Sequence, residues 1–382
     1  MLYKLDMSSL SIVMPSMNEE ETIRICIEKA QSIFKKYGIE GEIIIADNSS
    51  DRTAEIAASM GAKVIGPIKG YGNAYLKGLA KAKGDYIAIA DADNTYDLLE
   101  LDRFLDPLMA GEADFIMGTR LKGDIKKGAM PWLHQYIGNP FLTAMLNLLF
   151  GTKISDAHCG MRAFTKEALE KMNLKTHGME LASEMVIEAA KCELRIKEVP
   201  ITYYSRRAPS KLRSFQDGWR HIRFMMLYRP LPFLFLPGAV VFVLGVLITG
   251  SLLLTGDVAE NRLHSFILGC MLLILGGQTL STGAYLKTYG LVRGMYPNNK
   301  GNTAKWLNYH SLEKELFAGS IILIAGLLLG LKVVYTWISS GYGSLSEVKN
   351  AVISMVFAFI GLQMIFSAIV LSVMLLEVDT DW

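Results

Sequence analysis

The chain has 382 residues, of which 51% are hydrophobic, and its formal net charge is +2 at pH 7. Its length exceeds that of one ordinary domain and its apolar content excludes a wholly soluble protein, so we expect part of it to lie in lipid. The small net charge gives no argument for nucleic acid as a partner. Four widely separated cysteines match no zinc spacing and predict reduced thiols in the cytosol: Cys26, Cys159, Cys192 and Cys270.

Strands and helices alternate between residues 11 and 93. Short apolar runs predict strands at residues 11–15, 42–47, 63–66 and 86–93, and the segments between them predict helices at 19–38, 53–61 and 73–84. Apolar strands separated by helices predict an α/β fold with a mostly parallel sheet covered on both faces. Ligands of such sheets bind beyond the carboxyl ends of the strands, which brings PSMNEE (15–20), DNSSD (47–51) and DADN (91–94) to one edge.

Two aspartates, Asp91 and Asp93, follow the last of these strands. Hard oxygen donors one residue apart on a tight turn can converge on a Mg²⁺ or Mn²⁺ ion and on the diphosphate that it neutralises. The alternative is that both aspartates only cap a turn, which is the commoner role of an isolated pair.

Two further loops reach the same edge. Asp47 and Asn48 offer groups for a ribose or a base, although this loop also suits an ordinary helix N-cap. The glycine-rich KGYGNA around Gly70 fits neither the dinucleotide motif nor the P-loop. It predicts a turn that admits close approach of a ligand to the backbone.

Four long apolar stretches follow residue 230 and predict an all-α transmembrane domain at residues 231–254, 263–287, 316–339 and 350–376. Each is long enough for about 20 helical residues to cross a hydrocarbon core of roughly 30 Å. The basic loop between the second and third spans predicts that this loop and both termini face the cytosol. The N-terminus lacks signal-peptide features, so we expect the first domain on the cytosolic side. The predicted domains are residues 1–205, a basic segment 206–230, and 231–382.

Six motifs occur in a fixed order: MPSMNEEE, IIIADNSSDRTAEIA, KGYGNA, ADADN, MGTR and DAHCGMR. This ordered set resembles the inverting glycosyltransferases of the dolichyl-phosphate mannose synthase and polyprenyl-phosphate glycosyltransferase group. The resemblance covers about residues 10–225 and implies a GT-A fold, a nucleotide-sugar donor and a divalent cation at Asp91 and Asp93. It assigns nucleotide contacts to Pro15, Glu19 and Asp47, and we expect the same edge to contribute Asn18, Asn48, Gly70, Asp91 and Ala92.

Two positions depart from the family pattern. Met17 stands where an aromatic residue is common, and Thr95 replaces a glutamine that helps to hold the metal in the family. The resemblance therefore defines neither the sugar nor the nucleotide, and UDP- and GDP-hexoses both remain compatible.

The segment 206–230 carries seven Arg or Lys residues against one acid, Asp217. Its apolar residues follow helical spacing, which predicts an interfacial helix on an anionic leaflet; the alternative is a basic cluster that only enforces topology. In the resembling family an Arg followed by Ser-Lys handles phosphate, which points to Arg206, Ser210 and Lys211. Arg120 and Arg162 are further candidates for binding the phosphate of the lipid or of the donor.

A lipid monophosphate is already an anion, so it can attack the anomeric carbon without strong general-base help. We expect Asp93 and Asp91, through a metal, to stabilise the departing nucleoside diphosphate, and a single displacement to invert the anomeric carbon. Asp156 is the candidate for positioning or weakly deprotonating the acceptor, and Glu184 is the second candidate. His158 and Cys159 lack the further ligands that a zinc site needs.

Three function classes follow. The favoured one is a membrane enzyme that makes a polyprenyl-phosphate sugar on a dolichyl or undecaprenyl carrier for cell-envelope glycan or glycoprotein synthesis. A processive polysaccharide synthase is the second, although QDGWR (216–220) does not match its QxxRW motif. The third is a lipid carrier or scaffold without catalysis. The sequence leaves open whether the protein forms a homo-oligomer.

Overall fold

The computed structural model describes residues 9–207, 214–256, 258, 262–296, 309–342 and 347–375. The chain divides into two compact units, Met1–Phe224 and Met225–Trp382, and each is described by itself. The boundary lies inside the segment 206–230, so most of the helix predicted there belongs to the first unit.

A seven-stranded sheet forms the centre of the first unit, in the order β3-β2-β1-β4-β6-β5-β7. Only β6 runs antiparallel to its neighbours, β4 and β5; the other pairings in the sheet are parallel. This confirms the predicted α/β class. The strands are β1 (Ser9–Ser16), β2 (Glu40–Asp47), β3 (Lys63–Ile65), β4 (Tyr86–Ile89), β5 (Phe115–Ile125), β6 (Arg162–Thr165) and β7 (Ile196–Tyr203).

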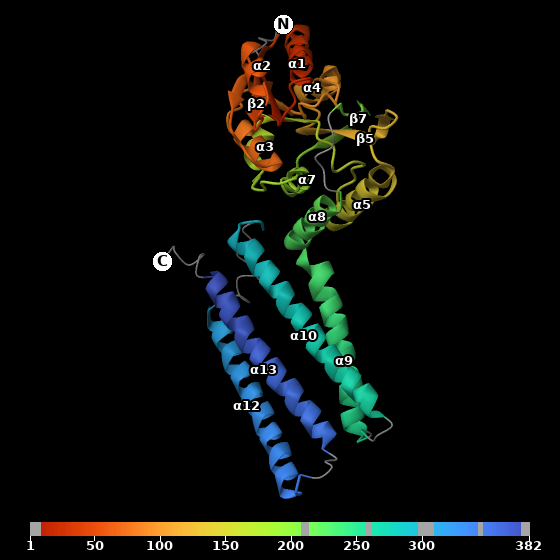
Figure 1. The fold of residues 1–382 in the computed structure, drawn as a ribbon, viewed down its shortest axis with the longest axis vertical. Coiled ribbons are helices and arrows are strands. Elements are labelled where there is room, and N and C mark those ends of the chain that lie inside the picture. The colour runs from red at the N-terminus through yellow and green to blue at the C-terminus, as the bar shows by residue number, and fades with distance from the viewer. Residues whose placement is uncertain are drawn as a thin grey trace. The chain divides into compact units, whose positions relative to one another are not determined.

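Helices pack around this sheet (Figure 1). α1 and α4 share a core with the β1 face that carries Leu10, Ile12 and Met14. α3 packs on the other face, where Gly78 leaves room for the Val13 side chain. The helices are α1 (Ile23–Tyr37), α2 (Thr53–Ser59), α3 (Tyr71–Leu79), η1 (Leu98–Leu101), α4 (Asp102–Met109), η2 (His134–Gly138), α5 (Asn139–Phe150), α6 (Lys166–Lys171), α7 (Leu181–Lys191) and α8 (Ser214–Tyr228).

The predicted strands and helices of residues 11–93 are all present, with shifted ends. α1 starts at Ile23 rather than at residue 19, and it ends where Gly38 takes a left-handed φ of 61°, which glycine adopts without strain. The cysteines are free thiols. Burial raises the pKa of Cys26 and of Cys159 to about 12, so both thiols stay protonated at neutral pH.

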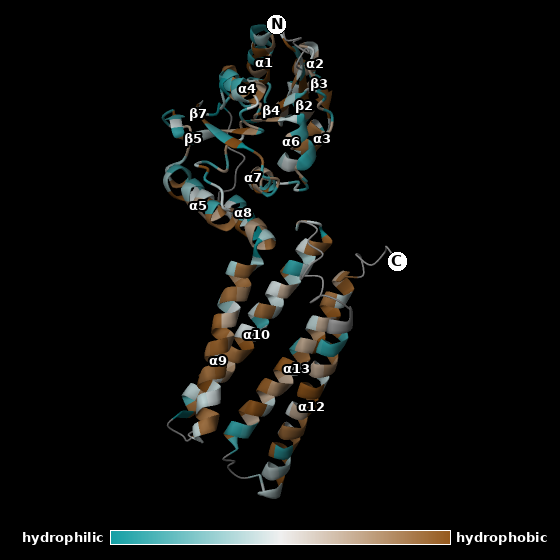
Figure 2. Ribbon diagram, turned by 180° about the vertical axis from the view of Figure 1, so that it is seen from behind, coloured by the Kyte–Doolittle hydropathy of each residue, from teal (hydrophilic) through white to brown (hydrophobic). Residues whose placement is uncertain are grey.

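The second unit contains, among the described residues, four helices long and apolar enough to cross a membrane. Figure 2 shows them mainly in the brown of hydrophobic residues. They match the four predicted spans to within a few residues: Leu231–Leu254 (η3, Leu231–Phe235, continued by α9, Leu236–Thr255), Leu263–Val292 (α10), Leu312–Ser339 (within α12, Tyr309–Ser339) and Val348–Leu375 (α13). Sequence and structure together describe a multi-pass membrane protein.

Small residues let the apolar helices approach closely. A Cβ on Gly361 of α13 would lie 2.4 Å from the Leu323 nitrogen of α12, and one on Gly326 of α12 would lie 2.5 Å from the Ala358 nitrogen of α13. Lipid tails are as apolar as these side chains, so helices in a bilayer associate through such close backbone packing.

Candidate active site

A cavity of about 910 Å³ opens in the first unit at the carboxyl ends of β1 and β4. β1 lies between β2 and β4, so the chain order reverses at this point of the sheet, as it does at the ligand sites of other open α/β sheets. The predicted residues that line the cavity are Pro15, Glu19, Asn48, Gly70, Asp91, Ala92, Asp93, Arg120 and Arg206. The edge predicted from the sequence is therefore the wall of a real cavity.

Two tyrosines of α3 hold the Asp91 side chain in place by hydrogen bonds. Tyr71 and Tyr75 both donate their hydroxyl protons to Asp91 Oδ1, at 2.8 and 3.1 Å. Burial and repulsion from Asp93 raise the pKa of Asp91 to about 6. Burial and the neighbouring Asp93 charge thus disfavour ionisation of Asp91.

Asp93 is held by its own turn. Its Oδ1 accepts from the Thr95 backbone N–H at 3.0 Å and from the Thr95 hydroxyl at 2.6 Å, while Asn94 takes a left-handed φ of 57°. The turn-capping alternative therefore holds for Asp93. It does not exclude metal binding, because these bonds use only Oδ1 and fix the direction of Oδ2.

These residues fit a divalent cation through their donor chemistry. No group of three or more His, Cys, Asp and Glu residues that could hold a metal occurs in the described ranges. Mg²⁺ is commonly held by one or two carboxylates, with the remaining positions filled by substrate phosphates and water. Asp91 and Asp93 form such a partial set, and a cation there would relieve the repulsion that raises the Asp91 pKa.

Arg206 lies beside this pair. Its guanidinium forms ion pairs with Glu19 and, at 3.4 Å from its Nε to Oδ2, with Asp93. Two residues expected to contact different substrates, Glu19 and Arg206, are therefore neighbours in one wall of the cavity. Ser210 and Lys211, predicted to bind phosphate together with Arg206, lie outside the described residues.

Asp47 and Asn18 do not line the cavity but tie its loops together. Asp47 Oδ1 accepts from the Ser16 and Ser49 hydroxyls at 2.6 and 2.5 Å. Asn18, at a left-handed φ of 55°, accepts from the Ser50 N–H at 2.8 Å. These bonds join the loops after β1 and β2 and thereby position Pro15 and Asn48.

Asp156 and Arg120 form a buried bidentate ion pair. Arg120 Nε lies 2.7 Å from Asp156 Oδ2 and its terminal nitrogen 2.9 Å from Oδ1, and the Arg120 backbone N–H donates to Oδ2 at 3.1 Å. Burial alone would raise the pKa of Asp156, but the Arg120 guanidinium outweighs it and holds that pKa below its usual value. The Asp156 carboxylate is fully buried and both of its oxygens accept from Arg120. This arrangement suits a residue that positions Arg120 better than a base that deprotonates an acceptor.

Two other predicted residues are engaged elsewhere. Arg162 is 1% exposed and donates to three backbone carbonyls, those of Cys159, Ala157 and Ala182. It therefore fastens the loop before β6 to α7, and it does not line the cavity. Glu184 is fully buried on α7, where its carboxylate accepts from Lys175 and Thr176; it does not line the cavity.

The sequence did not identify the far wall of the cavity. This wall consists of residues 128–131, His134, Gly138, Asn139 and Leu142, of α8 residues that include Arg220 and His221, and of His158. The interfacial helix predicted at 206–230 thus also contributes to the candidate site. Within α8, the His221 side chain is buried and Trp219 is half exposed.

His158 and His221 meet edge to face with ring centroids 4.4 Å apart. His221 Nδ1 lies 2.8 Å from the Ser183 hydroxyl, and burial lowers the His221 pKa to about 4. Neither ring nitrogen of His158 has a hydrogen-bond partner among the described residues, and burial holds its pKa well below the usual value. Both imidazoles are therefore neutral at pH 7.

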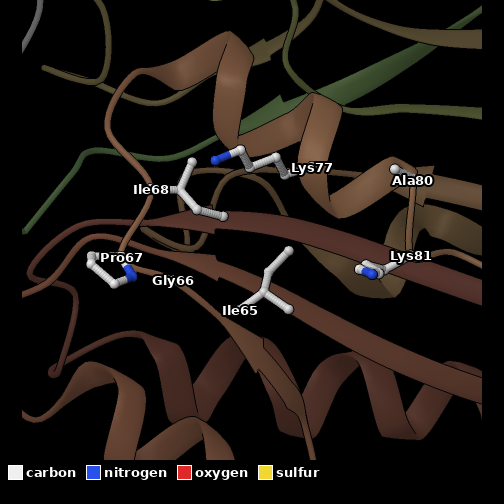
Figure 3. Close-up of a pocket in the computed structure, with 7 residues that line it drawn as sticks. All are labelled: Ile65, Gly66, Pro67, Ile68, Lys77, Ala80 and Lys81. Atoms are coloured by element: carbon white, nitrogen blue, oxygen red, sulfur yellow. The ribbon is translucent and has the colours of Figure 1, made fainter.

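A second pocket, of about 330 Å³, lies at the end of β3 (Figure 3). Its lysines come from α3 and the turn after it, and its other residues mainly from β3 and the loop after it. None of the predicted site residues lines it: the lining is Ile65, Gly66, Pro67, Ile68, Lys77, Ala80 and Lys81.

Two family models match the chain: glycosyl transferase family 2 over residues 11–172, and the glycosyltransferase family 2 C-terminal transmembrane region over residues 284–375. The chain is 43% identical over 368 residues to the low-salt glycan biosynthesis hexosyltransferase Agl6 of Haloferax volcanii, covering 95% of this chain and 88% of that protein. It is 34% identical over 212 residues to the dolichyl-phosphate hexose transferase of the same organism, covering 55% of this chain and 89% of that protein.

Among solved structures, the glucosyl-3-phosphoglycerate synthase of Mycobacterium tuberculosis has a TM-score of 0.48 and 22% identity, covering 57% of this chain and 79% of that chain.

Proposed function

The chain belongs to glycosyltransferase family 2, and we propose that it transfers a hexose from a nucleotide-sugar to a polyprenyl phosphate with inversion, using Mg²⁺ or Mn²⁺. The observation that carries this proposal is the Asp91–Asp93 turn in the wall of a cavity at the switch point of the sheet. The names of the two Haloferax relatives support the hexose, and one of them supports dolichyl phosphate as the acceptor. The membrane-spanning helices suit an acceptor that stays in the bilayer.

The donor would lie along the cavity wall formed by the loops at the carboxyl ends of β1, β2 and β4. Asn48 and Pro15, positioned by Asp47, would meet the nucleoside, and the turn of Asp91 and Asp93 would meet the diphosphate. A bound divalent cation would neutralise the diphosphate and make it a better leaving group. Thr95 keeps the Asp93 carboxylate aimed at this point through its 2.6 Å bond.

The acceptor phosphate would be bound by guanidinium groups. Arg206 lies next to Asp93. Arg120 lines the same cavity, and its guanidinium is held in place by the ion pair with Asp156. Guanidinium groups suit phosphate because they offer paired donors in a plane. A phosphate aligned in this way needs no strong base, so we assign Asp156 the positioning of Arg120.

The proposal is tested by incubating the full-length protein in lipid with a panel of radiolabelled nucleotide-sugars, polyprenyl phosphate and Mn²⁺. We expect a product that enters organic solvent and is released by mild acid. Insoluble polymer would instead favour a processive synthase, and no incorporation with any donor would favour a carrier or scaffold. Orientation of the first unit toward the cytosol remains a prediction, which protease accessibility in sealed vesicles checks.

A further inference from the structure

Residues 129–150 form an uncharged segment on the catalytic unit. It contains no Asp, Glu, Lys or Arg, and it runs from the loop after β5 through η2 and α5. Figure 1 shows α5 at one end of the first unit, beyond the sheet. A surface helix of a soluble domain normally carries charged residues on its outer face, so the lack of charge needs an explanation.

The segment has two apolar faces. One face packs on the domain and includes Met130, Leu142 and Leu146. The outer face bears large apolar side chains that are about half or more exposed: Trp132 65%, Leu133 55%, Tyr136 60%, Ile137 49%, Phe141 58% and Leu148 85%. Leu133, Ile137, Phe141 and Leu148 recur at helical spacing, so they form one stripe.

The ends of the segment suit the boundary between lipid and water. Trp132 and Tyr136, whose rings lie 5.7 Å apart, are the residue types that gather at membrane interfaces. Exposed lysines flank the segment, Lys127 before it and Lys153 after it. Lysines at such positions reach the headgroups of anionic lipids.

We propose that the outer face of residues 129–150 inserts into the headgroup and upper acyl region of the bilayer, as a second membrane attachment separate from the four spans. A second copy of the chain is the alternative occupant, but lysines are depleted at protein interfaces, whereas exposed lysines flank this segment at both ends, as they do in helices that lie on a membrane surface.

The attachment has a consequence for the acceptor, and this step rests on the proposed function. Met130, Pro131, His134, Gly138, Asn139 and Leu142 of the same segment line the catalytic cavity. An inserted segment therefore puts one wall of the cavity at the lipid surface. A phosphate whose hydrocarbon tail remains in the bilayer can then reach the cavity without leaving the membrane plane.

The insertion is tested with the full-length protein in liposomes. Ile137→Cys and Leu148→Cys are labelled with an environment-sensitive fluorophore in a Cys192→Ser background, and Leu99→Cys serves as the control. Leu99 is an apolar side chain of the same unit, 45% exposed, and lies outside the segment. We expect blue-shifted emission and quenching by spin-labelled lipids at 137 and 148, and water-like emission at 99. Water-like emission at 137 and 148, or shielding without lipid quenching, overturns the proposal.

A second arm measures function. Phe141→Glu with Leu148→Glu should raise the KM for a long polyprenyl phosphate in vesicles by roughly tenfold or more, because each buried charge weakens insertion. In this double variant, the affinity for the nucleotide-sugar and the turnover of a short, soluble isoprenyl phosphate should stay unchanged. In the control variant Leu99→Glu, these two quantities and the KM for the long polyprenyl phosphate should all stay unchanged. An equal loss with both acceptors contradicts the inference. If the wild type transfers no sugar at all, the proposed function fails, and lipid quenching still decides the insertion.

Discussion

Replacement of Asp156 with asparagine separates a positioning role from a general-base role. The carboxylate is 0% exposed, and the Arg120 side chain with which it pairs is 9% exposed. Removal of one partner of a buried pair costs about 3–5 kcal/mol, because the other charge is left uncompensated. We expect Asp156→Asn to lower the free energy of unfolding toward the lower end of that range, since the amide retains one acceptor for Arg120.

The exposed pair of Arg195 with Asp114 provides a matched control. It is also bidentate, with bonds of 2.9 and 2.7 Å, but its side chains are 57% and 27% exposed. An exposed pair contributes about 0–1 kcal/mol, so Asp114→Asn should change the unfolding temperature little. Thermal unfolding of both variants in detergent, beside the wild type, measures the difference.

The pH–rate profile completes the test. If Asp156 positions Arg120, the Asp156→Asn enzyme has lower turnover and a higher KM for the polyprenyl phosphate, with a profile of unchanged shape. The opposite result would be a pH–rate profile that loses its dependence on a deprotonated base, together with an unchanged free energy of unfolding. That result would refute the positioning role and restore Asp156 as the general base.

Four further predictions concern the metal turn. Because the pKa of Asp91 is raised to about 6, above the unfolded value of about 3.9, the metal-free protein loses stability as pH rises through this window. Asp91→Asn should therefore stabilise it above pH 6, as thermal unfolding measures, and wild-type Mn²⁺ affinity should fall below pH 6, as electron paramagnetic resonance titration measures. Thr95→Val removes the hydroxyl bonded to Asp93 and should weaken Mn²⁺ binding roughly 3- to 10-fold; unchanged affinity would mean that the turn holds Asp93 without it. Gly160→Ala places a Cβ 3.0 Å from Asp91 Oδ2 and should reduce Mn²⁺ affinity, whereas Gly218→Ala, with no atom within 4 Å, should not.

The α/β class, the four spans and the position of the site follow from patterns that the sequence carries locally. Apolar runs with helices between them define parallel strands, and the ends of β1, β2 and β4 must then share an edge. For this reason the sequence alone predicts that Asp91 and Asp93 share one wall with Asn48. Family membership was also predictable, because the motifs keep their order along the chain.

The partners of individual side chains did not follow from the sequence. Arg162 and Arg120 belong to similar motifs, yet one binds three backbone carbonyls and the other a buried carboxylate that still borders the cavity. Such choices depend on loops that meet only in the folded chain. Likewise, Glu184 sits on a helix with ordinary periodicity, and only the fold shows that its carboxylate holds residues 175 and 176.

The uncharged segment was missed for a different reason. Its apolar residues occupy both faces of the helix, so periodicity alone predicts buried core. Only the exposed fractions of residues such as Phe141 and Leu148 separate the packed face from the outer one. The absence of charge between Lys127 and Lys153 was the signal available in the sequence.

The most direct test of the central claim is the formation of lipid-linked sugar by the wild type and by Asp93→Asn, both reconstituted with polyprenyl phosphate and the best nucleotide-sugar of the panel. The wild type should form an acid-labile, lipid-soluble product only when Mn²⁺ or Mg²⁺ is present, with the anomeric configuration opposite to that of the donor. Asp93→Asn should form at most about a hundredth as much, because the departing diphosphate loses several kcal/mol of stabilisation. Equal product from both proteins, undiminished by a chelator, would contradict the assignment of Asp91 and Asp93 as the centre of the active site.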